Sequence, residues 1–413
     1  MSKIKDPHLA EKGRLSHEWA KDHMKILTNT IDRLKKSQPL RGIRLGICLH
    51  ITKETSVLIM GAKALGAEVN VCSANPLSTQ DDIAAFLATN GINIYAWAGQ
   101  TPKEYDWCIE KMLSHKPQIL TDDGSDCHSK VHSDKKFSAL KIMGGTEETT
   151  TGVIRLQALA EQNKLRYPII SVNDAYTKHM FDNRYGTGQS TIDGYLRAMN
   201  LLIASKRVVV AGYGWVGRGV AARMNGMGAK VYVTEIDPVR ALEAHMDGYE
   251  VLQMEEAAKI GDIFVTATGQ TGVIRREHIM KMKDGTILGN VGHFDVEVDA
   301  KFLLNESKSV REVRSNLDEC LLKNGKRVYF IGKGRIANLV AAEGHPPEVM
   351  ALSFSNQLLS MMHIAKNYKK MGKKVITVPA EIDRQIAVDA LKAMDVKIDK
   401  PTAAQIKYAH SWG

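Results

Sequence analysis

Apolar positions near the start of the chain recur at helical spacing. Trp19, Met24 and Leu27 belong to a pattern that extends from about residue 8 to residue 37. Pro39 follows it and cannot continue a helix, so the sequence predicts one long helix here.

From residue 44 onward, short apolar runs typical of strands alternate with helical patterns. The predicted strands span 44–49, 68–72, 92–96 and 118–120, and the predicted helices between them span 55–65, 81–89 and 104–113. Such alternation predicts a parallel sheet with helices on both faces. We therefore expect the first half of the chain to be a doubly wound α/β domain, in which ligands bind beyond the carboxyl ends of the strands.

The strongest pattern lies at the centre of the chain, in residues 206–238. Three valines at 208–210 predict a buried strand, which breaks into a glycine-rich turn before a helical pattern resumes; its glycines are Gly212, Gly214 and Gly217. A second strand, 230–234, leads to Glu235. This arrangement predicts a dinucleotide site, because glycines let the backbone approach a pyrophosphate and the carboxylate accepts ribose hydroxyls. The alternative is a turn that only packs a helix on a sheet.

The strand and helix alternation resumes beyond this motif. The predicted strands span 263–266, 286–290 and 328–331. A Pro-Pro pair after His345 then marks a hinge-like break. A helical pattern follows to about Met371, then a strand at 374–378 and an amphipathic end.

Length and charge narrow the possible classes of protein. The 413 residues predict two or three domains, and 44% hydrophobic with 25% charged residues is typical of a globular protein. The net charge of +10 is compatible with a nucleic-acid partner, but the basic residues are dispersed and form no recognised binding motif. The densest basic group is interpreted as a solvated helix end; it contains Lys366, Lys369, Lys370, Lys373 and Lys374. We expect no nucleic-acid partner.

Cysteine usage and the N-terminal sequence indicate a cytoplasmic protein. The five cysteines show no CxxC pair and no zinc-site spacing, so we expect reduced thiols and no metal. The first 15 residues lack the apolar core of a secretory signal, and no window reaches about 18 consecutive apolar residues. We therefore expect no membrane span.

Clusters of polar residues follow the predicted strands of the first half. His50, Thr52 and Glu54 come after one strand, and Asp123 lies in an aspartate cluster after another. The carboxyl ends of parallel strands meet at one edge of a sheet, so these side chains are expected to lie near a ligand.

Three further features have ordinary structural explanations as well as functional ones. The sequence TEETTTG at 146–152 is also typical of a helix N-terminus. Lys178 and Asp182 lie four residues apart, as in a stabilising ion pair on one helix face. His293 follows a predicted strand and is equally typical of a hydrogen-bonded loop residue.

A series of motifs spans nearly the entire chain, from about residue 10 to the end. In order they are HITKET, NPLSTQDD, YAW, DDGSD, EETTTG, VNDAYTKHMFDNRYGTGQS, VAGYGWVGRG, TEIDP, GHFDVE, NLVAAEGHP and KYAHSW. In this order and spacing they resemble the S-adenosylhomocysteine hydrolase family, and its shorter bacterial and archaeal branch in particular.

The resemblance implies an α/β protein of two doubly wound Rossmann-like domains, one inserted into the other. The implied substrate-binding domain comprises residues 1–182 and 346–392, and the NAD-binding domain comprises residues 183–345. Residues 393–413 form a C-terminal segment expected to pack on another subunit of a homotetramer.

The implied activity is the reversible hydrolysis of S-adenosyl-L-homocysteine to adenosine and L-homocysteine, in the methyl cycle of one-carbon metabolism. In this family a bound NAD oxidises the ribose 3′ hydroxyl to a ketone, which acidifies the hydrogen on the 4′ carbon. Homocysteine then leaves the 5′ carbon, water adds, and the stored hydride returns.

The resemblance also implies roles for individual residues. Asp123 matches the base near the 4′ carbon and His50 a proton relay at the 5′ side. Lys178 lies beside the 3′ hydroxyl, where a neighbouring nicotinamide cation lowers its pKa so that it accepts a proton. The other implied substrate residues are Glu148 and Asp182 on the ribose hydroxyls, Asn173 in their support, His293 over nucleoside and cofactor, and Thr52, Glu54 and His345 around the base. The implied NAD contacts are Thr149, Thr150, Thr151, Asn183, Gly212, Gly214, Trp215, Val216, Gly217, Arg218, Gly219, Glu235, Arg240, Val291, Gly292, His293 and Asn338.

The chain departs from the family pattern at several positions. Thr187 stands where many members have a cysteine, and Lys333 replaces a usual glutamate without an explanation. The sequence ends without the family's longer tail, which predicts weaker cofactor retention. Arg240 can accommodate a 2′ phosphate, but Glu235 opposes that phosphate by charge, so NAD is expected rather than NADP.

Three other functions compete with this interpretation. An enzyme of the same mechanism acting on S-inosyl-L-homocysteine needs a donor for the oxo group of hypoxanthine, whereas Glu54 as a carboxylate only accepts. An inactive NAD-binding regulator is expected to have lost parts of the site, yet Asp123, Lys178 and His293 are present. A 2-hydroxy-acid dehydrogenase leaves TEETTTG unexplained.

Overall fold

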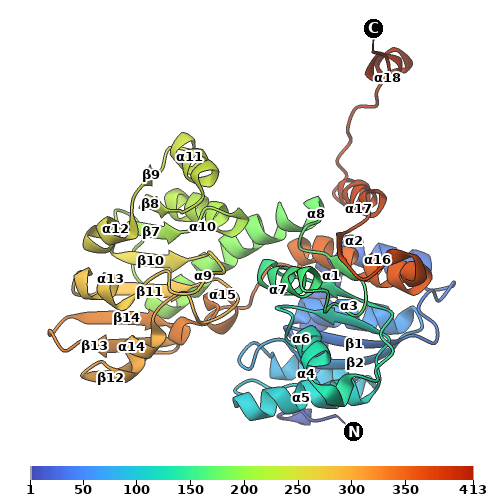
Figure 1. Ribbon diagram of the computed structural model, residues 1–413, viewed down its shortest axis with the longest axis horizontal. Helices are drawn as coiled ribbons and strands as arrows, with labels where there is room; N and C mark the ends of the chain where they lie inside the picture. Colours follow the sequence, from blue (N-terminus) through green and yellow to red (C-terminus); the bar gives the residue numbers. More distant parts are fainter. Residues whose placement is uncertain (1, 413) are drawn as a thin grey trace.

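The computed structural model describes residues 2–412 and folds them into two lobes, each built on one sheet (Figure 1). The strands of the first sheet come from residues 44–171 and 375–377, and those of the second come from residues 207–331. The segment that forms the second lobe is therefore inserted between two strands of the first sheet. This confirms the predicted fold class of two α/β units, one interrupting the other.

The first sheet has seven strands in the order β15-β6-β5-β4-β1-β2-β3, and all of its pairings are parallel. The strands are β1 (Arg44–Leu49), β2 (Glu68–Ser73), β3 (Asn93–Tyr95), β4 (Ile119–Asp122), β5 (Gly144–Glu147), β6 (Ile169–Ser171) and β15 (Val375–Thr377). The chain order reverses between β1 and β4, so the carboxyl ends of these two strands flank a topological switch point.

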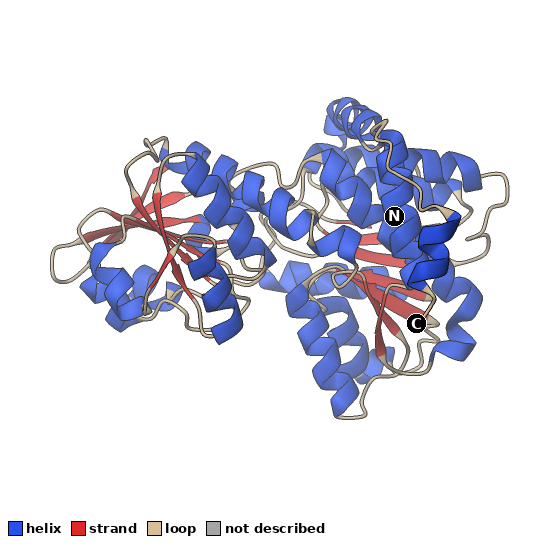
Figure 2. Ribbon diagram, turned by 90° about the horizontal axis from the view of Figure 1, so that it is seen from above, coloured by secondary structure: helices blue, strands red, loops and turns tan. Residues whose placement is uncertain are grey.

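Helices cover both faces of this sheet (Figure 2). They are η1 (Pro7–Leu9), α1 (Ala10–His23), α2 (Lys25–Leu34), α3 (Lys53–Ala64), α4 (Asp81–Thr89), α5 (Pro102–Ser114), α6 (Asp126–Ser133), η2 (Lys135–Phe137), α7 (Thr150–Glu161), α8 (Tyr176–His179), α16 (Pro347–Met371) and α17 (Ala380–Ala393). Leu45, Ile47 and Leu49 pack into one apolar cluster and Cys48 into another, because successive strand residues point to opposite faces.

The second sheet has eight strands in the order β12-β13-β14-β11-β10-β7-β8-β9. They are β7 (Arg207–Ala211), β8 (Lys230–Thr234), β9 (Glu250–Val251), β10 (Ile263–Thr266), β11 (Thr286–Asn290), β12 (Ser309–Arg314), β13 (Leu317–Leu321) and β14 (Arg327–Ile331). Its order reverses between β7 and β10, which gives this sheet a switch point of its own. Only the pairs β12–β13 and β13–β14 are antiparallel among the described strands.

The second lobe begins with a short π-helix, η3 (Asp182–Gly186), followed by α9 (Thr187–Met199). Its other helices are α10 (Trp215–Gly226), α11 (Pro238–Met246), α12 (Met254–Ile260), α13 (Arg276–Lys281), α14 (Ala300–Asn305), η4 (Gly332–Gly334) and α15 (Ala337–Val340), and α18 (Ala403–Ala409) lies at the end of the chain. A Cβ at Gly219 of α10 would lie 1.9 Å from the carbonyl oxygen of Arg184, so glycine permits η3 to pack directly on α10.

The predicted strands agree with the structure to within a few residues, but two predictions about helices are wrong and five strands were not predicted. The single N-terminal helix is two helices, α1 and α2, separated at Met24, whose ψ is 45°. Met24 is fully buried and both helices contribute to the same apolar cluster, so the apolar pattern continues across the break. Lys178 and Asp182 do not share one helix, since α8 ends at His179. The strands β5, β6, β9, β12 and β13 were not predicted; β12 gives no core-facing pattern, because all six of its residues are exposed.

The five cysteines are buried and none forms a disulfide. Among the described residues, no helix is long and apolar enough to cross a membrane.

The contact between α1 and α4 generates a prediction about stability. A Cβ at Gly13 would lie 2.0 Å from the carbonyl oxygen of Asp82, so Gly13→Ala forces the two helices apart. We expect the free energy of unfolding to fall by about 1–3 kcal/mol, as in other overpacked interiors, in a urea denaturation experiment. Gly226→Ala is the matched control: its Cβ would meet nothing within 4 Å, and we expect no loss of stability. Equal unfolding midpoints for the two variants would contradict the prediction.

Candidate active site

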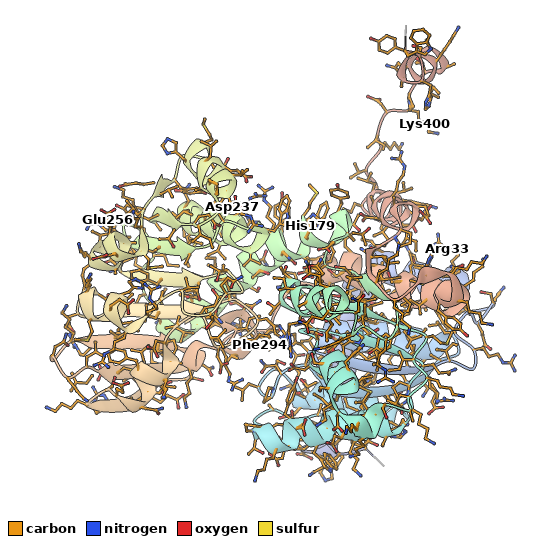
Figure 3. All side chains as sticks on the ribbon, in the orientation of Figure 1. Arg33, His179, Asp237, Glu256, Phe294 and Lys400 are labelled. Atoms are coloured by element: carbon orange, nitrogen blue, oxygen red, sulfur yellow. The ribbon has the colours of Figure 1, made fainter. Side chains whose placement is uncertain are left out.

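One cavity of about 1190 Å³ lies between the two lobes, and both switch points open into it. In the first sheet, β1 ends next to His50 and β4 leads to Asp123. In the second sheet, β7 leads to Gly212 and β10 leads to Thr268, and all four residues line the cavity. Figure 3 shows His179 and Phe294 where the lobes meet. The two sheets thus present their ligand-binding edges to the same space.

His50, Asp123 and His293 form a cluster in the wall of this cavity. The Asp123 carboxylate lies 3.4 Å from Nε2 of His50 and 3.5 Å from Nδ1 of His293. Nδ1 of His50 is 2.6 Å from the hydroxyl of Ser78. Burial lowers the pKa of His50 to about 4, although Asp123 opposes this shift. His50 is therefore neutral at neutral pH, and one ring nitrogen faces the carboxylate.

Gly124 allows His293 of the second lobe to approach this cluster. Its φ is +95°, and a Cβ there would lie 2.2 Å from Nε2 of His293. The guanidinium of Arg155 in α7 donates to the carbonyl oxygen of Gly124 at 2.6 Å and lies over the ring of Phe294 at 5.5 Å from its centroid. Arg155 therefore contacts the loops that carry Asp123 and His293 at once.

Lys178 lies in a second cluster, surrounded by carboxylates. Its Nζ is 3.3 Å from Asp182 and 3.6 Å from Glu148, and it donates to the side-chain oxygen of Asn183 at 2.7 Å. Burial opposes the positive charge of Lys178, but Asp182 and Glu148 outweigh it and raise the pKa of the ammonium. A further cation placed in the cavity would act in the opposite direction and lower this pKa.

The two carboxylates beside Lys178 have different electrostatic environments. Burial raises the pKa of Glu148, with Lys178 opposing. Burial also acts against the charge on Asp182, but Lys178 and His345 reverse this effect and hold its pKa below the usual range. Oε1 of Glu148 is buried and receives no hydrogen bond from the described residues, which leaves one acceptor free for a ligand.

Amide side chains extend this cluster toward α7. Asn183 donates to Asn173 at 3.1 Å, and Asn173 donates to the hydroxyl of Thr150 at 3.0 Å. Thr149, Thr150 and Thr151 at the N-terminus of α7 line the cavity. Thr149 precedes the helix without a side-chain capping bond, so this end of α7 is open to a ligand.

Two buried glutamates hold the loops of the site. Oε1 of Glu147 accepts from the backbone N–H of Gly124 at 2.8 Å and from that of Thr149 at 3.0 Å. In the second lobe, Glu297 accepts from the backbone N–H groups of Thr268 and Gly269. These carboxylates hold the amides that parallel strands leave unpaired at their ends.

The glycine-rich turn after β7 has the geometry expected of a dinucleotide site. Gly212 has φ of +97°, and a Cβ at Gly217 would lie 1.9 Å from its carbonyl oxygen. Gly214 precedes the first residue of α10 without a side-chain cap, and a Cβ there would meet only Arg240, at 3.8 Å. The turn therefore needs glycine at 217 for its own shape, whereas Gly214 leaves the helix N-terminus open toward the cavity.

Glu235 lies at the end of β8 and lines the cavity together with Arg240. Its carboxylate accepts from the backbone N–H of Tyr213 at 2.7 Å and from that of Ile236 at 2.7 Å. These bonds fix the carboxylate beside the turn, where an acidic residue recognises a ribose that lacks a 2′ phosphate.

Most of the predicted NAD contacts surround the same cavity. Trp215 and Val216 line it beside the turn, and Val291, Gly292 and Asn338 line it from the other side of the second sheet. The buried side-chain oxygen of Asn338 has no partner among the described residues. Three predicted contacts do not line the cavity: Gly217 and Gly219 serve close packing, and Arg218 pairs with Glu243. The open helix end, the fixed acidic residue and the free acceptor together fit NAD.

The remaining predicted residues gather at the end of the cavity near α3. Thr52 is the N-cap of α3 and accepts from the backbone N–H of Thr55. Glu54 is 1% exposed, and its Oε1 makes no hydrogen bond among the described residues, although the ammonium of Lys53 lies 3.3 Å from it. His345 enters from the segment after α15, where its Nδ1 lies 3.3 Å from Asp182.

The long helix α16 contributes site residues that the sequence pattern did not predict. Ser353 donates to Asp182 at 2.7 Å, and Gln357 donates to Glu148. Both are fully buried in a helix whose neighbouring positions are apolar, and this polar interruption in the sequence SFSNQ was the signal available. Ser78, the partner of His50, lies in the polar loop after β2, within the motif NPLSTQDD, but no role was predicted for it.

Within residues 2–412, two groups of side chains have metal-ligating atoms within 4.8 Å of one another. One is His50, Asp123 and His293, and the other is Asp122, His128 and Glu147. Both ring nitrogens of His128 already have partners, the hydroxyl of Tyr167 and the carbonyl oxygen of Thr146. Burial raises the pKa of Asp122 to about 7, so the second group fits a shared proton better than a metal.

Comparisons with known proteins agree with this geometry. A family model for S-adenosyl-L-homocysteine hydrolase matches residues 1–143, and a model for the NAD-binding domain of S-adenosyl-L-homocysteine hydrolase matches residues 183–344. The chain is 56% identical to the adenosylhomocysteinase of Sulfolobus acidocaldarius, across 99% of this chain and 98% of that protein. It is 55% identical to the adenosylhomocysteinase of Sulfurisphaera tokodaii, with the same coverage. It is also 51% identical to the S-inosyl-L-homocysteine hydrolase of Methanocaldococcus jannaschii, across 100% of this chain and 99% of that protein.

The chain shares this identity with relatives over their full length, and one cavity holds a dinucleotide turn and two buried clusters of ionisable side chains. The chain belongs to the S-adenosyl-L-homocysteine hydrolase family.

Proposed function

We propose that the protein catalyses the reversible hydrolysis of S-adenosyl-L-homocysteine to adenosine and L-homocysteine, with NAD as its resident cofactor. One observation carries this proposal. A single cavity holds a dinucleotide turn and two separate proton-transfer clusters, one around Lys178 and one around Asp123. A simple dehydrogenation needs one proton-transfer site, whereas oxidation followed by elimination needs two.

NAD, when bound, supplies a reversible hydride acceptor for the ribose 3′ carbon. The turn at Gly212 and Gly214 would hold its pyrophosphate, and Glu235 its adenosine ribose. The threonines that begin α7 and Asn338 would contact it from the two lobes.

Lys178 would accept the proton of the ribose 3′ hydroxyl. Its ammonium is held by Asp182 and Glu148, so the base form requires a positive charge nearby. Asp182 and Glu148 would accept hydrogen bonds from the two ribose hydroxyls, and the free Oε1 of Glu148 supports this role. Asn173 and Asn183 would hold the lysine in place.

Asp123 would take the proton from the 4′ carbon that the neighbouring ketone acidifies. His50, neutral because of its burial, would relay to the departing sulfur the proton that Asp123 has taken, and would later take a proton from the attacking water and return it to Asp123. His293 lies against Gly124 and would cover the nucleoside from the second lobe.

Glu54, with Thr52 and His345, would bind the base. Its buried acceptor fits the exocyclic amine of adenine, which favours the adenosine compound. The second candidate is hydrolysis of S-inosyl-L-homocysteine, since a relative of that name is 51% identical.

The proposal extends to assembly and location. We expect a cytoplasmic homotetramer that participates in one-carbon metabolism and binds neither nucleic acid nor membrane. The exposed apolar side chains Ile406, Tyr408 and Trp412 at the C-terminus support packing on another subunit. Five buried cysteines without a disulfide support a reducing compartment.

Thiol release tests the proposed reaction directly. The purified protein with NAD is offered S-adenosyl-L-homocysteine and S-inosyl-L-homocysteine separately, and free homocysteine is measured. We expect faster release from the adenosine compound because Glu54 is an acceptor. Preference for the inosine compound would contradict the role of Glu54, and no release from either compound would reject the hydrolase proposal.

Two variants separate the oxidation from the elimination. Lys178→Ala should lose about 10²- to 10⁴-fold in both thiol release and reduction of bound NAD by adenosine, because the 3′ proton has no acceptor. Asp123→Asn should lose thiol release but still reduce bound NAD. The control is Lys164→Ala, which removes an exposed lysine that contacts only Gln162. Thiol release at the wild-type rate in Lys178→Ala would disprove the assigned oxidation step.

The glycine turn gives a prediction about cofactor binding. In Gly214→Ala the new methyl group enters the space next to the helix N-terminus, so NAD affinity should fall about 10- to 100-fold while the melting temperature without NAD stays unchanged. In Gly217→Ala the methyl group strikes the carbonyl of Gly212, and both NAD affinity and melting temperature should fall. Calorimetric titration with NAD checks the prediction, which fails if Gly214→Ala binds NAD like the wild type.

A further inference from the structure

Lys53 lies between a buried and an exposed carboxylate at the base end of the cavity. Its Nζ is 3.3 Å from Oε1 of Glu54 and 3.0 Å from Oε2 of Glu343. The Lys53 side chain is 13% exposed, whereas that of Glu54 is 1% exposed and that of Glu343 is 58% exposed. Lys53 is thus mostly buried: its ammonium contacts Glu54 in the interior and Glu343 at the surface.

Glu54 depends on this lysine for its charge. Burial raises the pKa of the Glu54 carboxyl, and Lys53 is the strongest opposing influence. Lys53 is the only cation in ion-pair contact with Glu54 among the described residues. The other ionisable side chains at this end of the cavity are His50 and His345, and Glu343 and Arg197 lie beyond the lysine.

The protonation state of Glu54 decides which purine edge it can bind. Adenine carries an amine donor at the 6 position, and hypoxanthine carries an oxo acceptor there. An ionised carboxylate that faces this position accepts from the amine but meets the oxo group acceptor to acceptor. A neutral carboxyl group still accepts from the amine, and its O–H can also donate to the oxo group, so it no longer rejects hypoxanthine.

We propose that Lys53 determines the base specificity of the cavity: by pairing with Glu54 it keeps that carboxylate ionised, so the site selects a 6-aminopurine nucleoside over a 6-oxopurine nucleoside. Lys53 acts through Glu54 and is a positioning residue, not a catalytic one. This inference rests on the proposed function, in which Glu54 binds the base.

Glu343 contacts Lys53 from the chain segment that returns from the second lobe to the first. It lies between α15 and α16, two residues before His345, and also contacts Arg197 of α9 at 3.4 Å. Its exposed carboxylate shares the charge of Lys53 but does not contact Glu54. Loss of Glu343 therefore leaves the inner pair intact, which makes it a suitable control.

The test measures kcat/KM for thiol release from S-adenosyl-L-homocysteine and S-inosyl-L-homocysteine, using the NAD-loaded enzyme. Lys53→Met removes the charge and keeps the length of the side chain. We expect the adenosyl-to-inosyl ratio to fall about tenfold, mostly through faster cleavage of the inosyl compound. Lys53→Gln should act in the same way if the methionine variant does not fold. Lys53→Arg retains the cation and should keep the wild-type ratio.

Two controls address nonspecific effects. Glu343→Gln should leave the ratio within about twofold of wild type, and so should Lys63→Met, which removes a lysine near the other end of α3. In Lys53→Met the ratio should recover at higher pH as Glu54 ionises, a change that a general loss of packing does not produce.

The outcomes separate the two proposals. Cleavage of both compounds with a wild-type ratio in Lys53→Met and Lys53→Gln would overturn the role of Lys53 and leave the hydrolase function standing. Cleavage of neither compound by the wild-type enzyme would overturn the function itself, and the inference with it.

Discussion

The site depends on the way two buried carboxylates hold the ends of parallel strands. Glu147 binds the amides of Gly124 and Thr149, and thereby fixes the loop of Asp123 relative to the loop of Glu148. Glu297 does the same for the turn after β10. Each carboxylate packs against a glycine, Gly152 or Gly292, where a Cβ would collide with it. Short loops without secondary structure of their own thus become rigid supports.

Charge balance gives the two clusters of ionisable side chains opposite properties. Around Lys178 two carboxylates surround one cation, so the ammonium is stable in the protein alone and becomes basic only next to another positive charge. Around Asp123 the neighbouring imidazole of His50 is kept neutral by burial. One cluster therefore responds to the charge of what binds in the cavity, while the other already holds a neutral imidazole beside a carboxylate.

Much of the fold could be predicted from the sequence, because buried parallel strands are nearly continuous apolar runs: β8, β10 and β11 begin and end where the pattern does. The exposed strand β12 lacked such a run, and the break at Met24 leaves the apolar period intact. Within the site, residues next to strand ends were found, since topology brings those ends together. Ser353 and Gln357 come from α16. They could not be predicted to contact Asp182 and Glu148, because they lie far from these two residues in the sequence.

The insertion of the second lobe has a consequence for how the chain folds during synthesis. Strand β15 and helix α16 complete the first sheet and its core, where Phe354, Leu358 and Ile364 are buried, yet they emerge only after the inserted lobe. The inserted lobe is one continuous segment and can close its own core first. Until β15 and α16 are synthesised, the N-terminal half therefore has β6 unpaired on one side and part of its core exposed. The half of the protein that is synthesised first should therefore be the later of the two to complete its core.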